Sequence, residues 1–445
     1  MCADIIEAMG HMFTPIREVL RIGVKTFVFN VIETPCRKMN KQLTDHVIFL
    51  GAGASFTSGY PIGQELRLRI TSKKHIAEEL RKIVSPESVD PKGRELFRQC
   101  LDNVEYFADS IELFRHGGFG TVDEFSRLAS TKYPKRVQDV KALMRFVLSL
   151  HNPENNFHES DYYPFVQKLF DNTLYGLKPN LTVITFNYDC YLDFLIQKAF
   201  RYRQKLSPNP DRLDKLYRSI LTSGFYQRDN VTEWAEQNAN FNFYKLHGSI
   251  TYGNDEHWGY KTLFEHDTYT RLDWLNRRFI HQDPPPIVFP WELFDSRSER
   301  FVSEDEFILA KECETRDQPE QGQRLFKHFV SMWQAAEQKV ADAKKISFVG
   351  LSMHEFLDKG FRYLLKNNRN DVQIVVANPD NQHFKDDTTL LNPDSPCGKV
   401  AALLKNVAPD MKWRYSGMSN SLTMTEKISI TPRYSFKEFI EREME

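Results

Sequence analysis

His46-Val-Ile-Phe-Leu-Gly-Ala-Gly-Ala-Ser55 decides the fold, because in this stretch an apolar strand runs directly into a glycine turn. Residues 47–50 are β-branched, aromatic or aliphatic, as in a parallel strand that is buried on both faces. Gly51 and Gly53 allow the backbone to turn tightly, and a helical pattern follows from about Ile62. The backbone N–H groups of such a turn point at one spot, which suits a phosphate group.

Further segments of the chain have β character, and helical patterns lie between most of them. We predict strands at residues 181–186, 241–246, 287–289, 345–349 and 372–377, and helices over 325–343 and 355–366. Strands that alternate with helices imply right-handed crossovers and a mostly parallel sheet covered on both faces. The sequence therefore predicts an α/β fold with a doubly wound, Rossmann-like sheet.

A long helical pattern interrupts this sheet after its first strand. Between about 64 and 177, apolar residues recur at every third and fourth position, and Thr121 with Glu124 has the spacing of a capping box. We predict a Rossmann-like core from residues 41–65 and 178–385, a helical insertion at 66–177, and separate terminal segments at 1–40 and 386–445.

The N-terminal segment has a second pattern of its own. Arg17, Arg21 and Lys25 recur every fourth residue and would share one face of a helix over residues 12–34. This pattern favours an amphipathic packing or oligomerisation helix. A membrane-surface anchor is the less favoured alternative, because the segment lacks tryptophan and carries few cations.

The composition of the 445 residues excludes several classes of protein. The 59 Lys and Arg residues nearly balance the 60 Asp and Glu residues, so the net charge gives no support for direct binding of nucleic acid. No apolar run approaches the length of a membrane span. The six cysteines form no CxxC pair, which argues against a disulfide framework and a four-cysteine zinc site. We expect a cytoplasmic protein without zinc.

Polar clusters follow the carboxyl ends of predicted strands, where open parallel sheets bind their ligands. Each cluster also has a structural alternative. The glycine turn departs from the GxGxxG fingerprint at Phe56, Asn187 and Asp189 suit a helix cap, and a lone histidine is usually a core residue. Their convergence on one edge of the sheet favours a binding site. The clusters are residues 51–55, Asn187 with Asp189, His247 with Ser249, residues 350–352 and residues 378–380.

Taken in order, these clusters resemble the NAD-binding core of the sirtuins. They are most similar to the prokaryotic sirtuin-like NADases of anti-phage defence systems, over roughly residues 46–63 and 180–385. The resemblance implies an enzyme that cleaves NAD to nicotinamide and ADP-ribose. The motifs are Gly-Ala-Gly-Ala-Ser55, Ser58-Gly-Tyr-Pro61, Asn187-Tyr-Asp189, His247-Gly248, Gly350-Leu-Ser-Met353 and Asn378-Pro-Asp380.

The same resemblance implies roles for individual residues. Asn187 would position the nicotinamide ribose and the attacking water, supported by Asp189. His247 would act as the base, for which an ordinary imidazole pKa of about 6.5 is suited. The expected NAD-binding residues are Gly51, Ala52, Gly53 and Ser55 at the pyrophosphate, and Gly350, Ser352 and Asn378 at the adenosine half.

Two departures from the sirtuin pattern argue against protein deacylation. Residues 249–347, where deacylases carry a zinc ribbon, contain one cysteine, Cys313. The Gly-Ile-Pro-Asp-Phe-Arg motif is replaced by Gly59-Tyr-Pro-Ile-Gly-Gln64, which lacks the phenylalanine and the arginine. Val122-Asp-Glu-Phe125 resembles a helix start of the defence NADases, with no chemical role assigned to its aspartate.

Two other functions remain open at this stage. The chain could be a non-catalytic sensor or scaffold that binds NAD or ADP-ribose, although the presence of both Asn187 and His247 tells against this alternative. An NAD-dependent protein deacylase or ADP-ribosyltransferase is the third possibility, which the missing zinc ribbon disfavours. The resemblance also implies a homo-oligomer, and in some systems a HerA-like ATPase or a short Argonaute as partner.

Overall fold

The computed structural model divides into two units, Met1–Leu43 and Thr44–Glu445. Every described residue belongs to the second unit, so the predicted N-terminal helix over 12–34 lies outside the description. The described residues are 45–83, 90–107, 120–132, 136–151, 160–170, 178, 180–196, 199, 242–250, 287–295, 300–303, 307, 319–353, 355–368, 372–378, 394–407, 413–414, 422–425 and 428–444.

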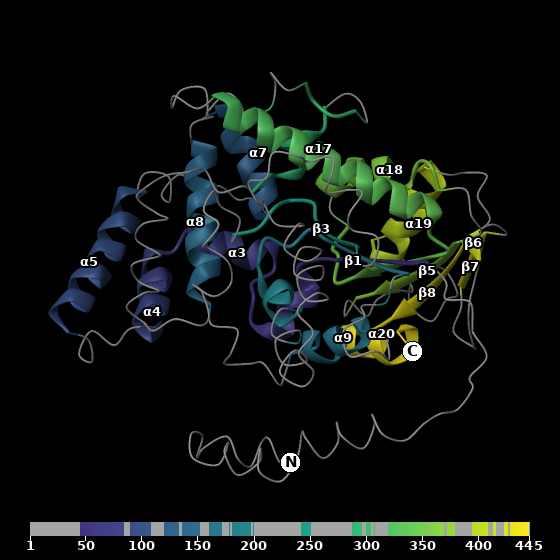
Figure 1. Cartoon of the computed structure of the whole chain (residues 1–445), viewed down its shortest axis with the longest axis horizontal. Coiled ribbons are helices and arrows are strands. Elements are labelled where there is room, and N and C mark those ends of the chain that lie inside the picture. The colour runs from purple at the N-terminus through teal and green to yellow at the C-terminus, as the bar shows by residue number, and fades with distance from the viewer. Residues whose placement is uncertain are drawn as a thin grey trace, which may run out of the picture. The chain divides into compact units, whose positions relative to one another are not determined.

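Among the described residues, eight strands form one sheet at the centre of this unit (Figure 1). Its strand order is β3-β2-β1-β4-β5-β6-β8-β7, and all neighbours are parallel except β7 and β8. The order reverses direction between β1 and β4, as in a doubly wound sheet. The predicted fold class is therefore confirmed. The strands are β1 (His46–Leu50), β2 (Leu181–Thr185), β3 (Asn242–Lys245), β4 (Lys345–Val349), β5 (Val372–Ala377), β6 (Trp413–Arg414), β7 (Leu422–Thr425) and β8 (Ile428–Arg433).

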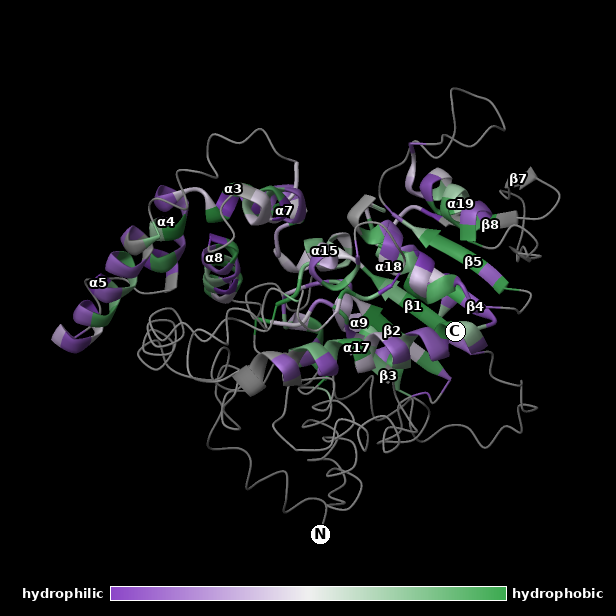
Figure 2. Ribbon diagram, turned by 90° about the horizontal axis from the view of Figure 1, so that it is seen from above, coloured by the Kyte–Doolittle hydropathy of each residue, from purple (hydrophilic) through white to green (hydrophobic). Residues whose placement is uncertain are grey.

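Helices cover both faces of the sheet (Figure 1). α17 (Pro319–Asp342), α18 (Glu355–Leu365) and α19 (Pro396–Val407) cover one face, and α9 (Tyr162–Leu169) and α20 (Phe436–Glu443) cover the other. Successive side chains of a strand point to opposite faces, so the alternate residues of β1 enter two separate cores. Figure 2 shows the hydrophobic strands between helices of mixed character. This double cover explains the unbroken apolar run of β1.

The helical insertion lies between β1 and β2, as predicted. The 3-10 helix η1 (Ala52–Ser58) begins within the glycine turn, and the next helix, α3 (Gly63–Ile70), begins one residue after Ile62. α3, α4 and α7 pack against α8, which is buried over most of its length. The capping box is confirmed, because Glu124 N donates to Thr121 Oγ1 and Thr121 N donates to Glu124 Oε2. These helices are α3 (Gly63–Ile70), α4 (Lys73–Ile83), α5 (Pro91–Tyr106), α7 (Val122–Lys132) and α8 (Arg136–Leu150).

Two parts of the sheet differ from the sequence prediction. Residues 287–289 do not join the sheet as a strand. Ile287 makes an isolated antiparallel bridge to Gly248, and α15 (Pro290–Leu293) follows at once because Pro290 is suited to the first position of a helix. Conversely, β6, β7 and β8 extend the sheet past residue 385, where no strand was predicted. Pro432 lies within β8, and a proline weakens the sequence signal of a strand.

Among the described residues, no helix is both long and apolar enough to cross a membrane. Within the same residues, no group of three or more His, Cys, Asp or Glu side chains is placed to hold a metal ion.

Candidate functional site

A pocket of about 460 Å³ opens where the ends of β1, β2 and β4 meet the helical insertion. This volume is in the range of small-molecule sites, and open α/β sheets bind ligands at this reversal of strand order. Nine of the ten predicted site residues line the pocket, namely Gly51, Ala52, Gly53, Asn187, Asp189, His247, Gly350, Ser352 and Asn378. Pro379 and Asp380, which follow Asn378 in its motif, lie outside the described residues.

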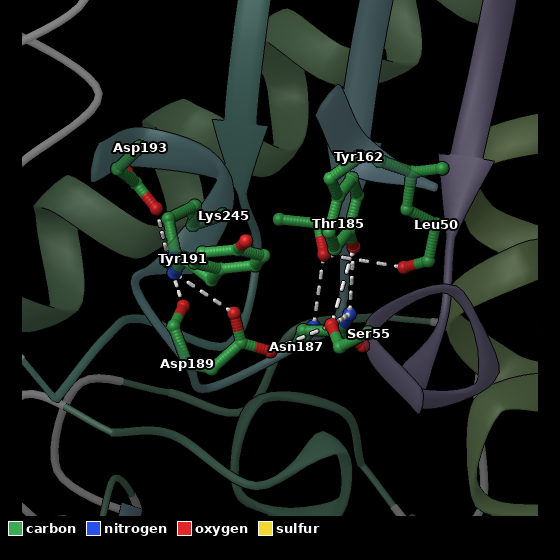
Figure 3. Close-up of polar contacts among 9 residues, drawn as sticks. All are labelled: Leu50, Ser55, Tyr162, Thr185, Asn187, Asp189, Tyr191, Asp193 and Lys245. Atoms are coloured by element: carbon green, nitrogen blue, oxygen red, sulfur yellow. Dashed lines mark hydrogen bonds and ion pairs between the residues drawn. The ribbon is translucent and has the colours of Figure 1, made fainter. Parts of the chain in front are cut away.

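Ser55 is the predicted residue that does not line the pocket. It is 1 % exposed and lies behind the wall, where it contacts two of the predicted catalytic residues (Figure 3). Its Oγ donates to Asp189 Oδ2 at 2.9 Å and accepts from Asn187 Nδ2 at 2.9 Å. The Tyr162 hydroxyl lies 3.2 Å from the same Oγ. The position of Ser55 suits it to orient side chains rather than to touch a ligand.

Asn187 follows β2 and binds the glycine turn through its side chain. Its Nδ2 donates to the carbonyl oxygen of Gly51 at 2.9 Å and contacts the Tyr162 hydroxyl at 3.4 Å. A carbonyl oxygen can only accept, so the nitrogen of the amide must face Gly51. The amide oxygen is then the side-chain atom of Asn187 left to accept a hydrogen bond from a ligand or a water.

Asp189 caps the helical turn that begins at Tyr191, because its Oδ1 accepts from the Tyr191 N–H at 3.0 Å. The helix cap that the sequence offers as the structural alternative for Asp189 is therefore found. Burial raises the pKa of Asp189, and the charge of Lys245 opposes this shift. Lys245 donates to the Asp189 carbonyl oxygen and forms a buried ion pair with Asp193, N–O 2.7 Å (Figure 3).

The glycine turn packs tightly against the loop that follows β4. The N–H groups of Gly51 and Gly53 donate to the carbonyl oxygens of Val349 and Gly350, both at 2.9 Å. Two of the N–H groups expected to face a phosphate are therefore already used. A Cβ on Gly53 would lie 2.9 Å from the Gly350 Cα, so the glycines of this turn are required for close approach of two backbones.

Gly350→Ala is expected to destabilise the chain by roughly 2 kcal/mol or more. Gly350 has φ +62°, and a Cβ there would lie 2.2 Å from the backbone nitrogen of Ala54. Gly63→Ala is the matched control, because its Cβ would meet no atom closer than 3.5 Å. Urea denaturation of the two variants measures the difference. Equal stability would contradict the tight contact between the two loops.

His247 is 2 % exposed and packs among three aromatic rings. The ring centroids of Phe186, Tyr188 and Trp333 lie 5.1, 5.8 and 6.3 Å from the imidazole. The backbone of Phe186 is hydrogen-bonded to the ring, whereas Nε2 has no partner among the described residues. Burial lowers the pKa of His247 to about 3, so the expectation of an ordinary imidazole pKa is wrong. The ring is neutral at physiological pH, with Nε2 as an acceptor.

The helical insertion supplies pocket residues to which the sequence assigned no function. Thr121, Val122 and Asp123 at the start of α7 line the pocket, and so do residues 60–64, which precede the insertion. The Tyr188 hydroxyl donates to Asp123 Oδ1 at 2.8 Å. In the sequence, residues 122–125 resemble a helix start of the defence NADases. That resemblance marks Asp123 but does not indicate that Tyr188 is its hydrogen-bond partner. Asp394 and Lys399, at the start of α19, line the pocket as well.

The chain matches no protein-family model, and no curated protein matches it. The structure itself establishes an α/β fold with a Rossmann-like parallel sheet, which is compatible with binding of a nucleotide.

Proposed function

We propose that the chain is a sirtuin-like NAD glycohydrolase, which cleaves NAD to nicotinamide and ADP-ribose and acts in anti-phage defence. One observation carries the proposal: Asn187 and His247 line the same pocket as the glycine turn after β1, and the buried Nε2 of His247 has no partner among the described residues. The position of the pocket in the sheet supports a nucleotide as ligand. The order of the motifs supports NAD as that nucleotide.

The chemistry of NAD cleavage fits the side chains of this pocket. Nicotinamide is bound as a cation and leaves as a neutral molecule, so no acid has to protonate it. The transition state resembles an oxocarbenium ion, which a water attacks without a strong base. A neutral imidazole of low pKa can accept a hydrogen bond from that water or from a ribose hydroxyl through Nε2. The amide oxygen of Asn187 can accept a second one.

Aromatic rings in the pocket can bind the cationic nicotinamide ring of the substrate. Phe186 and Tyr188 both line the pocket beside His247. The face of an aromatic ring attracts a cation, and the attraction is lost when the charge disappears on cleavage. The two rings would therefore favour bound NAD over released nicotinamide.

The test of the proposal is release of nicotinamide from NAD by the purified chain. Release without an added peptide supports the glycohydrolase, and release that requires an acetylated peptide supports the deacylase. Binding of NAD without cleavage supports the sensor. We predict that activity requires a homo-oligomer or a partner such as a HerA-like ATPase or a short Argonaute, so the assay includes the product of the neighbouring gene.

The rate of cleavage is expected to show no titration step near pH 6.5. The neutral form of His247 is the active one, and its pKa of about 3 keeps that form populated as the pH falls. The acid limit is expected from Asp189, whose pKa burial raises above its usual value. Measurement of kcat/KM from about pH 8 to about pH 5.5 checks this. A loss of activity centred near pH 6.5 would contradict the burial of His247.

A further inference from the structure

The first turn of α7 brings a carboxylate from the helical insertion to the strand ends. The capping box formed by Thr121 and Glu124 fixes the start of the helix, with Asp123 between them. Trp291 Nε1 also donates to Ser126 Oγ at 2.8 Å, which ties α7 to the segment after residue 287. Asp123 therefore lies in the pocket on a helix terminus that is fixed by the capping box and by the bond from Trp291.

Tyr188 connects this carboxylate to the imidazole of His247. Its hydroxyl donates to Asp123 Oδ1 at 2.8 Å, and its ring stacks on His247 with an interplanar angle of 27°. A hydrogen bond to a carboxylate is stronger than one between neutral groups. Because the bond anchors the far end of the ring, it fixes the plane against which the imidazole packs.

Few polar contacts hold His247 itself. Its ring is hydrogen-bonded to the Phe186 backbone, and among the described residues Nε2 has no partner. The orientation of Nε2 therefore depends on the rings packed around the imidazole. Of the three, Tyr188 is the one whose polar end is bound by the helical insertion.

We propose that Asp123 is a positioning residue for His247, which acts by holding the Tyr188 ring against the imidazole. The insertion is then part of the catalytic site, and a movement of α7 relative to the sheet would alter the geometry of Nε2. The kinetic consequences of this inference rest on the proposed function, whereas its structural consequence does not.

The kinetic test uses substitutions at both ends of the hydrogen bond. Asp123→Ala and Tyr188→Phe are each expected to lower kcat for NAD cleavage by about 10- to 100-fold and to leave KM within about twofold. The double variant is expected to lose no more activity than the less active single variant, because both substitutions remove the same hydrogen bond. Asp123→Asn, whose amide oxygen can still accept, is expected to recover most of the activity.

Asp139→Ala is the matched control. Asp139 lies in the first turn of the next helix of the insertion, α8, pairs with Arg136 at 3.2 Å and does not line the pocket. Its removal is expected to leave kcat within about twofold. A rise in KM with Asp123→Ala, together with a fully active Tyr188→Phe, would overturn the proposal in favour of direct substrate contact.

A second measurement does not depend on enzymatic activity. A ring stacked on the imidazole shifts its proton resonances upfield, so loss of the stack moves the His247 signals downfield. In histidine-labelled protein, with His247 assigned by the His247→Gln variant, Asp123→Ala is expected to show this shift and Asp123→Asn is not. Unchanged His247 signals in Asp123→Ala would overturn the proposal even if the chain cleaved NAD, and the shift would support it even if the chain did not.

Discussion

Replacement of His247 or Asn187 by alanine is expected to lower the rate of NAD cleavage by about 100-fold or more, with the chain still folded. His247 and Asn187 line the same pocket, and the buried Nε2 of His247 has no hydrogen-bond partner within the part of the chain that the structure describes. A group placed against the reacting water or ribose lowers the activation free energy by about 3–5 kcal/mol. Nicotinamide release at saturating NAD measures kcat, and the dependence on NAD concentration measures KM.

Stability controls are needed because both side chains are buried. Alanine at 187 removes the bond to the Gly51 carbonyl oxygen, and alanine at 247 leaves a cavity among aromatic rings. Thermal unfolding of each variant therefore accompanies the kinetics, and His247→Gln serves as a less disruptive second variant. Turnover close to that of the unmodified chain, at matched stability, would refute the assignment of these two residues.

Lys141→Met is expected to reduce the free energy of unfolding by about 3–5 kcal/mol. Lys141, on α8, pairs with Glu292 with an N–O distance of 2.7 Å, and both side chains have no exposed surface. Glu292 also accepts from the Phe289 N–H at 2.7 Å, and the Lys141 ammonium lies 5.5 Å from the Phe289 ring. Lys141 is the ion-pair partner of Glu292 among the described residues, so its removal takes away the positive charge that neutralises a buried carboxylate. Urea denaturation measures the loss.

Two variants separate the buried charge from a general effect of removing a lysine. Lys74→Met, which removes an 88 % exposed lysine paired at 3.9 Å, is expected to change stability by less than about 0.5 kcal/mol. Lys141→Met with Glu292→Gln is expected to recover much of the loss, since glutamine is neutral and its oxygen can still accept from Phe289 N–H. If the free energy of unfolding of Lys141→Met were no lower than that of Lys74→Met, the ion pair would not stabilise the contact between α8 and α15.

The sequence predicted the elements whose signal is local. The apolar run of β1, the turn at Gly51 and Gly53, and the capping box of Thr121 and Glu124 follow from side-chain period and short-range hydrogen bonding, and all are found. β8 was not predicted, because Pro432 weakens the sequence signal of a strand. Its place in the sheet depends on pairing with β5, which is far away in the sequence.

Local sequence placed Asn187, Asp189 and His247 at strand ends, because the carboxyl ends of parallel strands share one edge of a sheet. Only the tertiary structure decided which contacts and which burial those side chains have there. The pKa of His247 depends on burial among rings from two separate segments, residues 186–188 and α17, and the bond between Asp123 and Tyr188 joins the insertion to the strand ends. Desolvation and hydrogen-bond partners are set by neighbours that come together on folding, which a periodic pattern along one segment does not encode.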